Sequence, residues 1–311
     1  MKTQKFLISA FALAGAIVVL TTSCGKDEDP VPASLPQIGG YSSADEVASA
    51  DLLAYWPLNG SGNESKSNTA PTTAVGATYE AGAKGQGLKL VDGYLAFPNI
   101  TNLTRTMSGL TISAWVKVTN NQTAVADSGS ASTIYSQAIP GDWRGNIVLY
   151  AETGQYRPTN MAGAINDSIK VKAGWNTIAN GGQIYESWPK LESWMVADNL
   201  ITPGKHVAAP NKTGGKWAQL VFTWDGSNNK FIIYSNGAKI SNPAFEVRGT
   251  NTTITTDVTS TPFIGAFGNF ATTPDSWNKK MTGSVDEIRI WKKTLSAADI
   301  LSLYELEKAG R

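Results

Sequence analysis

The amino-acid sequence predicts an all-β fold, a two-sheet antiparallel sandwich of the jelly-roll type with a short C-terminal helix. Short runs rich in Val, Ile, Thr and aromatic residues recur between clusters of Gly, Asn, Asp and Pro, as strands do between turns. An Asp-Gly and an Asn-Gly dipeptide among these runs favour tight hairpins. A convincing helical period of apolar residues occurs only at the C-terminus.

Residues 1–23 are predicted to be a lipoprotein signal peptide. Lys2 and Lys5 precede an apolar run from Phe6 to Leu20, and small polar residues follow it. This order is typical of a secretory signal. The run is shorter than the roughly 20 apolar residues that a membrane-spanning helix needs.

Cys24 is the predicted lipid-attachment residue. It is the single cysteine of the chain and therefore has no internal disulfide partner. Because His206 is the only histidine, a zinc or catalytic Cys-His site is not expected. The letters TTSC resemble a bacterial lipobox, although Leu20 lies four residues before the cysteine where the usual pattern prefers three. The alternative is an ordinary signal peptide with an incidental cysteine.

Residues 24–49 are expected to form a flexible tether, because they are rich in Pro, Gly, Ser and acidic residues and lack an apolar period. The letters KDED at 26–29 resemble the export tag of surface lipoproteins in Bacteroidota. This resemblance implies a protein that is lipid-anchored in the outer membrane and faces the cell exterior. The alternative is a merely solvated start of the linker.

Residues 50–311 are expected to form the folded domain. Removal of the signal peptide takes away Lys2 and Lys5, which leaves 24 basic residues against 25 acidic ones. This near-neutral balance argues against nucleic acid as a partner, because binding to phosphates needs a basic stripe. Contact with a membrane is expected through the lipid anchor only.

The strand-like runs have the length and the β-branched or aromatic content of strands. They lie at 52–58, 87–98, 110–118, 132–137, 146–153, 167–173, 217–225, 230–240, 262–267 and 285–291. The segment 141–216, which holds two of these runs, is longer than hairpin connections need, and we interpret it as a long insertion. Asp225-Gly226 and Asn236-Gly237 predict antiparallel neighbours on either side of each turn.

The C-terminal helix is expected over SAADILSLYELEKAG, residues 296–310. Ser296 as N-cap and Asp299 three residues later form a capping box, and Gly310 closes the helix. The face that is expected to pack on the sandwich carries Ile300, Leu301 and Tyr304.

A set of segments occurs in a characteristic order over about Leu52 to Glu307. They are YWPLNG, GQGLKLVDGYLAFP, LTISAWVKV, WAQLVFTWDGSNNKFIIYSNGAKI, PFIGAF and MTGSVDEIRIWKKTLSAADI. In this order they resemble laminin-G-like jelly-roll domains of the concanavalin A-like lectin/glucanase superfamily. The resemblance implies two curved antiparallel sheets, which bind glycans in many members and bind proteins or catalyse reactions in others. The fold alone does not choose among these functions.

Catalytic residues are not expected. A glycosidase needs two carboxylates about 5 to 10 Å apart, and the catalytic branch of the resembled superfamily carries a Glu-x-Asp-x-x-Glu strand that this sequence lacks. Serine-hydrolase and P-loop motifs are absent as well. The sequence therefore predicts a protein that is not an enzyme.

Asp286 and Asn59 are the candidate metal ligands. Asp286 is expected to share a strand face with Ile288 and Ile290, where a carboxylate needs hydrogen bonds or a cation. Some members of the resembled family bind calcium near the sandwich rim, and calcium takes such oxygen ligands. Asn59 stands where relatives often carry Asp, which weakens a site there. The alternative is that Asp286 accepts backbone N–H groups.

The candidate glycan-binding residues lie in the 141–216 segment, where tryptophans, Trp175 among them, occur in polar sequence interrupted by Gly and Pro. Aromatic rings stack on the apolar faces of sugars, and neighbouring polar groups bond hydroxyls. The candidates are Trp143, Arg144, Tyr185, Glu186, Trp188 and Trp194. The alternative is that these tryptophans anchor a small core of the insertion.

The predicted function is therefore that of a non-catalytic surface lipoprotein which binds polysaccharide or another glycan, in the manner of a lectin. One alternative is an adhesion or assembly protein that binds an outer-membrane protein partner through the same fold. A divergent glycoside hydrolase is the other.

Overall fold

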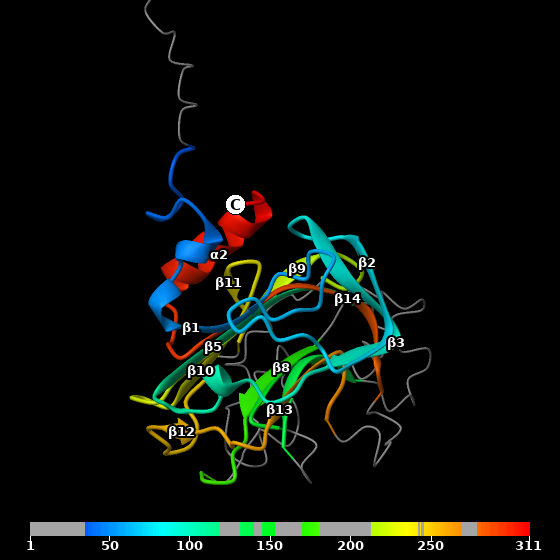
Figure 1. The fold of residues 1–311 in the computed structure, drawn as a ribbon. Coiled ribbons are helices and arrows are strands. Elements are labelled where there is room, and N and C mark those ends of the chain that lie inside the picture. Colours follow the sequence, from blue (N-terminus) through cyan, green and yellow to red (C-terminus); the bar gives the residue numbers. More distant parts are fainter. Residues whose placement is uncertain are drawn as a thin grey trace, which may run out of the picture. The chain divides into compact units, whose positions relative to one another are not determined.

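The structure is a computed structural model that describes residues 35–118, 131–139, 145–152, 170–180, 213–241, 243, 246–268 and 279–311. In these ranges the chain forms antiparallel β-strands and a C-terminal helix (Figure 1), which confirms the predicted all-β sandwich. None of the helices in the described ranges is long and apolar enough to cross a membrane.

The strands coincide with the expected runs, and three others, β2, β4 and β12, were not expected from composition. The elements are η1 (Ala44–Glu46), η2 (Ser49–Asp51), β1 (Leu52–Trp56), β2 (Thr73–Ala81), β3 (Gln86–Ala96), η3 (Thr101–Leu103), β4 (Thr106–Met107), β5 (Gly109–Lys117), β6 (Ala131–Ala138), β7 (Ile147–Glu152), β8 (Lys170–Trp175), β9 (Ala218–Asp225), β10 (Lys230–Ser235), β11 (Ala238–Lys239), β12 (Ile254–Thr255), β13 (Thr261–Ile264), β14 (Met281–Trp291) and α2 (Ala297–Lys308). β2 escaped sequence analysis because it is largely exposed and rich in Ala and Thr, so it shows no apolar run.

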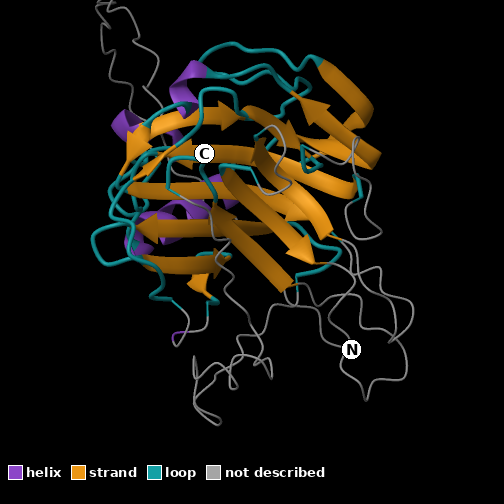
Figure 2. Ribbon diagram, turned by 90° about the horizontal axis from the view of Figure 1, so that it is seen from below, coloured by secondary structure: helices purple, strands orange, loops and turns teal. Residues whose placement is uncertain are grey.

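The described strands form one curled antiparallel sheet and a small second sheet. The order is β11-β10-β9-β5-β14-β3-β13-β6-β7-β8, with β1 beside β14, β2 beside β3, and β4 paired with β12. The curled sheet has two arms, one from β11 to β14 and the other from β13 to β8. β3 connects them, because its first part pairs with β14 and its end pairs with β13. Figure 2 shows the long strands lying side by side.

The main core lies between the two arms of the sheet. Trp56 on β1 contacts Tyr135 on β6 with ring centroids 5.6 Å apart, and Trp175 on β8 contacts Trp224 on β9 at 5.4 Å. All four side chains are buried. These contacts between distant strands close the sandwich, since tilted and edge-to-face aromatic pairs add to the free energy gained from burial.

Both predicted hairpins are confirmed. β9 pairs antiparallel with β10, and β10 pairs antiparallel with β11. The second turn has positive φ at Asn236 and Gly237, as the dipeptide predicts. In the first turn the positive φ falls on Asn229 instead of Gly226. The loop is therefore a longer one in which an asparagine takes the left-handed conformation.

The C-terminal helix begins with the predicted capping box. The Ser296 side chain accepts a hydrogen bond from the Asp299 backbone N–H, and the Asp299 carboxylate accepts one from the Ser296 N–H. The predicted packed face is correct at Ile300, which is buried, and at Tyr304, which stacks on Trp115 with ring centroids 5.5 Å apart, but Leu301 is 49 % exposed. The buried side of the helix carries Ile300, Leu303, Leu306 and Glu307.

The segment before β1 belongs to the folded domain. Val47 is buried in a second apolar cluster together with residues of α2, and the Tyr41 hydroxyl donates a hydrogen bond to Asp299 at 2.8 Å. In Figure 1 this segment lies beside α2. The compact unit starts at Pro36, so residues 36–49 do not belong to a free tether. The predicted boundary at residue 50 lies too late in the chain, because isolated apolar residues in a Ser- and Pro-rich stretch form no apolar run.

Candidate functional site

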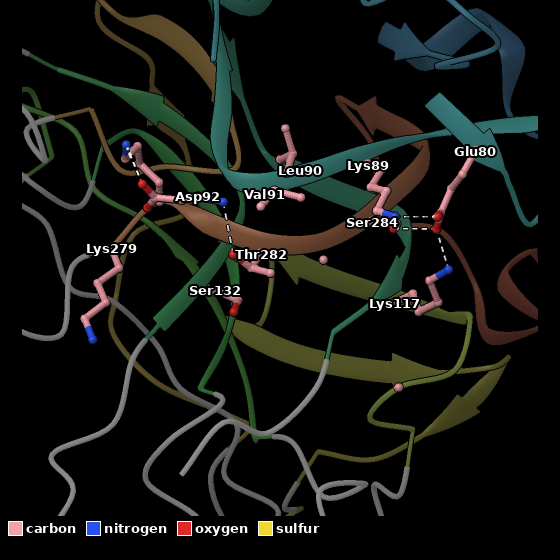
Figure 3. Close-up of a pocket in the computed structure, with 13 residues that line it drawn as sticks. Glu80, Lys89, Leu90, Val91, Asp92, Lys117, Ser132, Lys279, Thr282 and Ser284 are labelled. Carbon is pink, nitrogen blue, oxygen red and sulfur yellow. Dashed lines mark hydrogen bonds and ion pairs between the residues drawn. The ribbon is translucent and has the colours of Figure 1, made fainter. Parts of the chain in front are cut away.

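A pocket of about 730 Å³ lies where β2, β3, β5 and β14 meet (Figure 3). We call it the polar pocket. It is open to solvent, because the side chains of Asp92 and Lys89 on its wall are 70 % and 49 % exposed. The charged residues among the described part of its lining are Glu80, Lys89, Asp92, Lys117, Lys279 and Lys280.

Strand alternation brings side chains from distant parts of the chain to one face. On β3, Leu88 and Leu90 point into the main core, so Lys89 between them points to the other face. Lys117 on β5 and Ser284 on β14 follow the same rule. Ser284 is the register partner of Lys89 on one side and of Lys117 on the other. The three side chains therefore form a row across neighbouring strands.

The first polar cluster is centred on Glu80 of β2. Its carboxylate is ion-paired with Lys117, accepts a hydrogen bond from the Ser284 hydroxyl at 2.8 Å, and lies 3.6 Å from the Lys89 ammonium. The hydrogen bonds from Lys117 and Ser284 lower the pKa of Glu80. Glu80 is thus ionised at neutral pH, where it can accept hydrogen bonds but does not act as an acid.

The second polar cluster lies at the other end of the pocket. The Lys280 ammonium is 2.8 Å from the Asp92 carboxylate, and the Asp92 backbone N–H donates to the Thr282 hydroxyl at 3.0 Å. Val91, which is 57 % exposed, lies between this cluster and the first. The pocket therefore combines hydrogen-bond donors and acceptors with one accessible apolar side chain.

The two predicted metal ligands both bind the backbone of the β2–β3 turn. Asp286 accepts hydrogen bonds from the backbone N–H groups of Ala83 and Lys84 at 2.9 and 3.0 Å, and Asn59 Oδ1 accepts one from Gln86 N–H at 2.7 Å. N–H groups directed at these oxygens repel a cation. The geometry thus fits the hydrogen-bonding alternative better than calcium, and calcium binding remains a prediction.

Asp286 does not share a face with Ile288 and Ile290 as the alternation predicted. A β-bulge shifts the register between Asp286 and Arg289, and Glu287 has a φ of 48°. Val285 and the two isoleucines stay in the main core, while Asp286 turns toward the β2–β3 turn. A bulge of this kind adds one residue to the strand and inverts the alternation from that point.

A buried charged network lies near α2 and the segment before β1. Arg289 is 2.8 Å from Glu287 and 3.0 Å from Glu307, and both carboxylates are fully buried. Its guanidinium also lies over the Tyr55 ring, 3.7 Å from the centroid, and contacts Asp45 at 2.8 Å. The network links β14, β1, α2 and η1, so we assign it a structural role.

Two carboxyl groups in this region have strongly raised pKa values. Burial raises the pKa of Asp286 to about 7 against the opposing effect of its backbone hydrogen bonds, and the charge of Glu287 adds to the increase. Burial also raises the pKa of Glu307 to about 7, although Arg289 opposes the shift. Perturbed carboxyl groups often mark functional sites. Here both are enclosed and hydrogen-bonded, which favours a structural explanation.

The predicted glycan platform lies outside the described residues, as does the lipid-attachment residue Cys24. The platform residues are Trp143, Arg144, Tyr185, Glu186, Trp188 and Trp194. Within the predicted insertion 141–216, the described parts include β7 and β8, which are strands of the curled sheet. Trp175 is a buried core residue and not part of a binding loop.

A comparison with protein families gives the kind of domain. Residues 176–301, which include β9 to β14, match the family described as the concanavalin A-like lectin/glucanases superfamily. That part of the chain is similar to the family. A comparison with curated proteins returned no match.

Solved structures similar to this chain are distant in sequence. The binding domain of Paraclostridial Mosquitocidal Protein 1 has a TM-score of 0.52 and 12% identity, over 82% of this chain and 52% of that one. Domain 4 of AbnA, a GH43 extracellular arabinanase from Geobacillus stearothermophilus in complex with arabinotriose, has a TM-score of 0.48 and 17% identity, over 81% and 98%. Trypanosoma rangeli sialidase has a TM-score of 0.46 and 15% identity, over 83% of this chain and 33% of that one. The chain thus spans about half of the Mosquitocidal Protein 1 structure and a third of the sialidase. At 12% identity, the likeness to the first of these concerns the fold alone.

The polar pocket is not apparent from the amino-acid sequence. Its only signal was a lysine at an alternate position in each of two apolar runs, GLKLV and WVKV, which is ordinary for strands with one solvated face. Glu80 lies on β2, a strand that was not predicted. Only the pairing of β2, β3, β14 and β5 brings these residues together.

Proposed function

We propose that the folded part of this chain is a concanavalin A-like domain and that it binds a glycan in the polar pocket. The observation that carries this proposal is the exposed Val91 between two clusters of hydrogen-bonding groups. A sugar presents hydroxyl groups and apolar C–H patches side by side, so it needs donors, acceptors and an apolar contact within one site. The volume of about 730 Å³ suffices for several sugar units.

We propose further that binding occurs without catalysis. The general acid of a glycosidase has a raised pKa that keeps it protonated. In the polar pocket the described carboxylates belong to Glu80 and Asp92, and each is ion-paired with lysine. The pKa of Glu80 is lowered by Lys117 and Ser284, which is the opposite of what an acid catalyst requires. This charge state supports a binding role.

Filling the pocket should abolish binding. The exposed Thr282 lines the pocket, and Thr282→Trp adds a large side chain there without altering any charge. We expect the full chain to be retained on at least one polysaccharide of a broad panel, and the variant to bind that glycan at least tenfold more weakly by titration calorimetry.

The matched control is Thr255→Trp, also at an exposed strand threonine that makes a side-chain hydrogen bond, but on the small sheet. This control should bind as the unmodified chain does. Equal loss in both variants would contradict the location, and a panel without any bound glycan, with and without calcium, would contradict the function. A stoichiometric outer-membrane protein captured by a chain that binds no glycan would favour the adhesion alternative instead.

We also propose that the domain is anchored to the outer membrane through a lipid on Cys24 and faces the exterior, as the sequence motifs suggest. Cys24→Ser should abolish incorporation of labelled palmitate and move the protein from the membrane fraction to the soluble one. Ser23→Ala keeps the cysteine and should retain the label. Unchanged labelling of the Cys24 variant would exclude the anchor.

A further inference from the structure

We infer that the polar pocket selects acidic glycans, which are polysaccharides whose sugars carry carboxylate or sulfate groups. This inference rests on the proposed glycan-binding function and specifies the class of ligand. It follows from the charge of the pocket, from the accessibility of its lysines and from the spacing of its two polar clusters.

The pocket carries more positive than negative charge. In the first cluster Lys89 and Lys117 share the single carboxylate of Glu80. The second cluster also contains two lysines and one carboxylate, those of Lys279, Lys280 and Asp92. Each cluster therefore has an excess of one positive charge among the described residues. The chain as a whole has a net charge of only +1, so the excess is local.

The lysines are accessible to a ligand. The Lys117 and Lys280 side chains are 34% and 28% exposed, and the Lys89 side chain is more exposed than either. Lys279 is exposed and makes no ion pair with the described residues. Exposed ion pairs contribute little free energy, because water and salt screen them. An anionic group of a ligand can therefore approach these ammonium groups without breaking a strong internal interaction.

The positive excess is divided between the two ends of the pocket. The first cluster lies over β2, β5 and β14, the second lies at the β3–β14 end, and Val91 lies between them (Figure 3). A polymer that carries one anion on each sugar can place an anion at each end and a sugar ring against Val91. A neutral glycan gains only hydrogen bonds from the same groups. The arrangement thus favours a repeating polyanion over a neutral polymer.

The test compares binding of the full chain to polygalacturonate and to highly methyl-esterified pectin, which has the same backbone with its carboxylates neutralised. Dextran sulfate and dextran form the corresponding pair for sulfate. We expect at least one acidic polymer to bind tighter than its neutral partner, and this preference to shrink as sodium chloride is raised from 50 to 500 mM. The pair whose acidic polymer shows the larger preference over its neutral partner identifies whether carboxylate or sulfate is recognised.

Lys279→Gln combined with Lys280→Gln should weaken binding of the preferred acidic polymer roughly tenfold and weaken binding of its neutral partner less, because glutamine keeps a hydrogen-bond donor but loses the charge. The matched control replaces Lys292 and Lys293 by Gln, since this adjacent lysine pair is also exposed and lies 3.9 Å from a carboxylate, outside the pocket. The control should bind like the unmodified chain.

Equal binding of acidic and neutral polymers, or equal effects of the two double variants, would overturn the preference for acidic glycans while glycan binding itself stands. A chain that binds neither the acidic nor the neutral polymers, nor any other glycan of the panel, would overturn the proposed function as well. The two failures are thus distinguishable.

Discussion

Replacement of Arg289 by methionine is expected to lower the free energy of unfolding by about 3–5 kcal/mol. Arg289 is the one described cation in direct contact with both Glu287 and Glu307, which are buried without exposed surface. Removal of the guanidinium leaves two carboxylates in a medium of low polarity without their main counterion. Chemical denaturation monitored by tryptophan fluorescence measures the loss.

Lys308→Met is the matched control, because Lys308 pairs with Glu305 at 3.9 Å on the exposed side of α2. Its loss should stay below about 1 kcal/mol, as is usual for solvent-exposed ion pairs. Glu307→Gln in the Arg289→Met background should recover part of the stability, since it removes one uncompensated charge. If the two methionine variants lose the same small amount, the buried network contributes no more than a surface pair does.

Asp286 should make stability depend on pH in the direction opposite to most carboxylates. Its pKa is about 7 in the folded protein against 3.8 for the free group, so the folded state holds a proton that the unfolded state has released between these values. Because the folded state binds this proton more tightly, Asp286 contributes its full stabilisation of the folded state below about pH 4. This stabilisation is lost as the pH rises through about 7. The shift corresponds to at most about 4 kcal/mol.

The Asp286→Asn variant isolates this contribution, because the amide does not titrate. We expect the stability advantage of the unmodified chain over the variant to be largest near pH 4 and to shrink toward pH 8 in denaturation curves. Asp299→Asn gives a control of opposite sign. At Asp299, hydrogen bonds from Tyr41 and Ser296 lower the pKa by more than burial raises it. The stability advantage of the unmodified chain over Asp299→Asn should therefore grow as the pH rises from 3 to 5. A difference between unmodified chain and Asp286→Asn that is independent of pH contradicts the raised pKa.

Local sequence predicted those features whose causes are local. The hairpins after Asp225 and Ser235 follow from residues that accept positive φ, and the Ser296 capping box follows from side chains within one helical turn. The apolar runs predicted strands because alternation is a property of consecutive residues. The N-terminal segment and β2 were missed for the same reason, since neither contains a run.

Other features depended on which strands become neighbours. The side of the strand to which Asp286 points was predicted wrongly. The bulge at Glu287 arises where β14 pairs with β5, and this pairing is not visible in the sequence. The partners of Arg289 come from residues 45, 55, 287 and 307, and only the docking of α2 and of the segment before β1 brings them together. Their charges suggested no buried site in the linear sequence.

The amino-acid sequence was sufficient to predict the all-β class, the order of most strands and the capped C-terminal helix, and it showed the resemblance to a concanavalin A-like domain. The class, the strands and the helix follow from periodicity and turn chemistry within a few residues, and the resemblance rests on the order of the quoted segments. Strand pairing was needed to show that Lys89, Lys117 and Ser284 form one row and that Glu80 joins them from an unpredicted strand. The physical reason is that a pocket on a sheet is built across strands, perpendicular to the direction in which sequence patterns run.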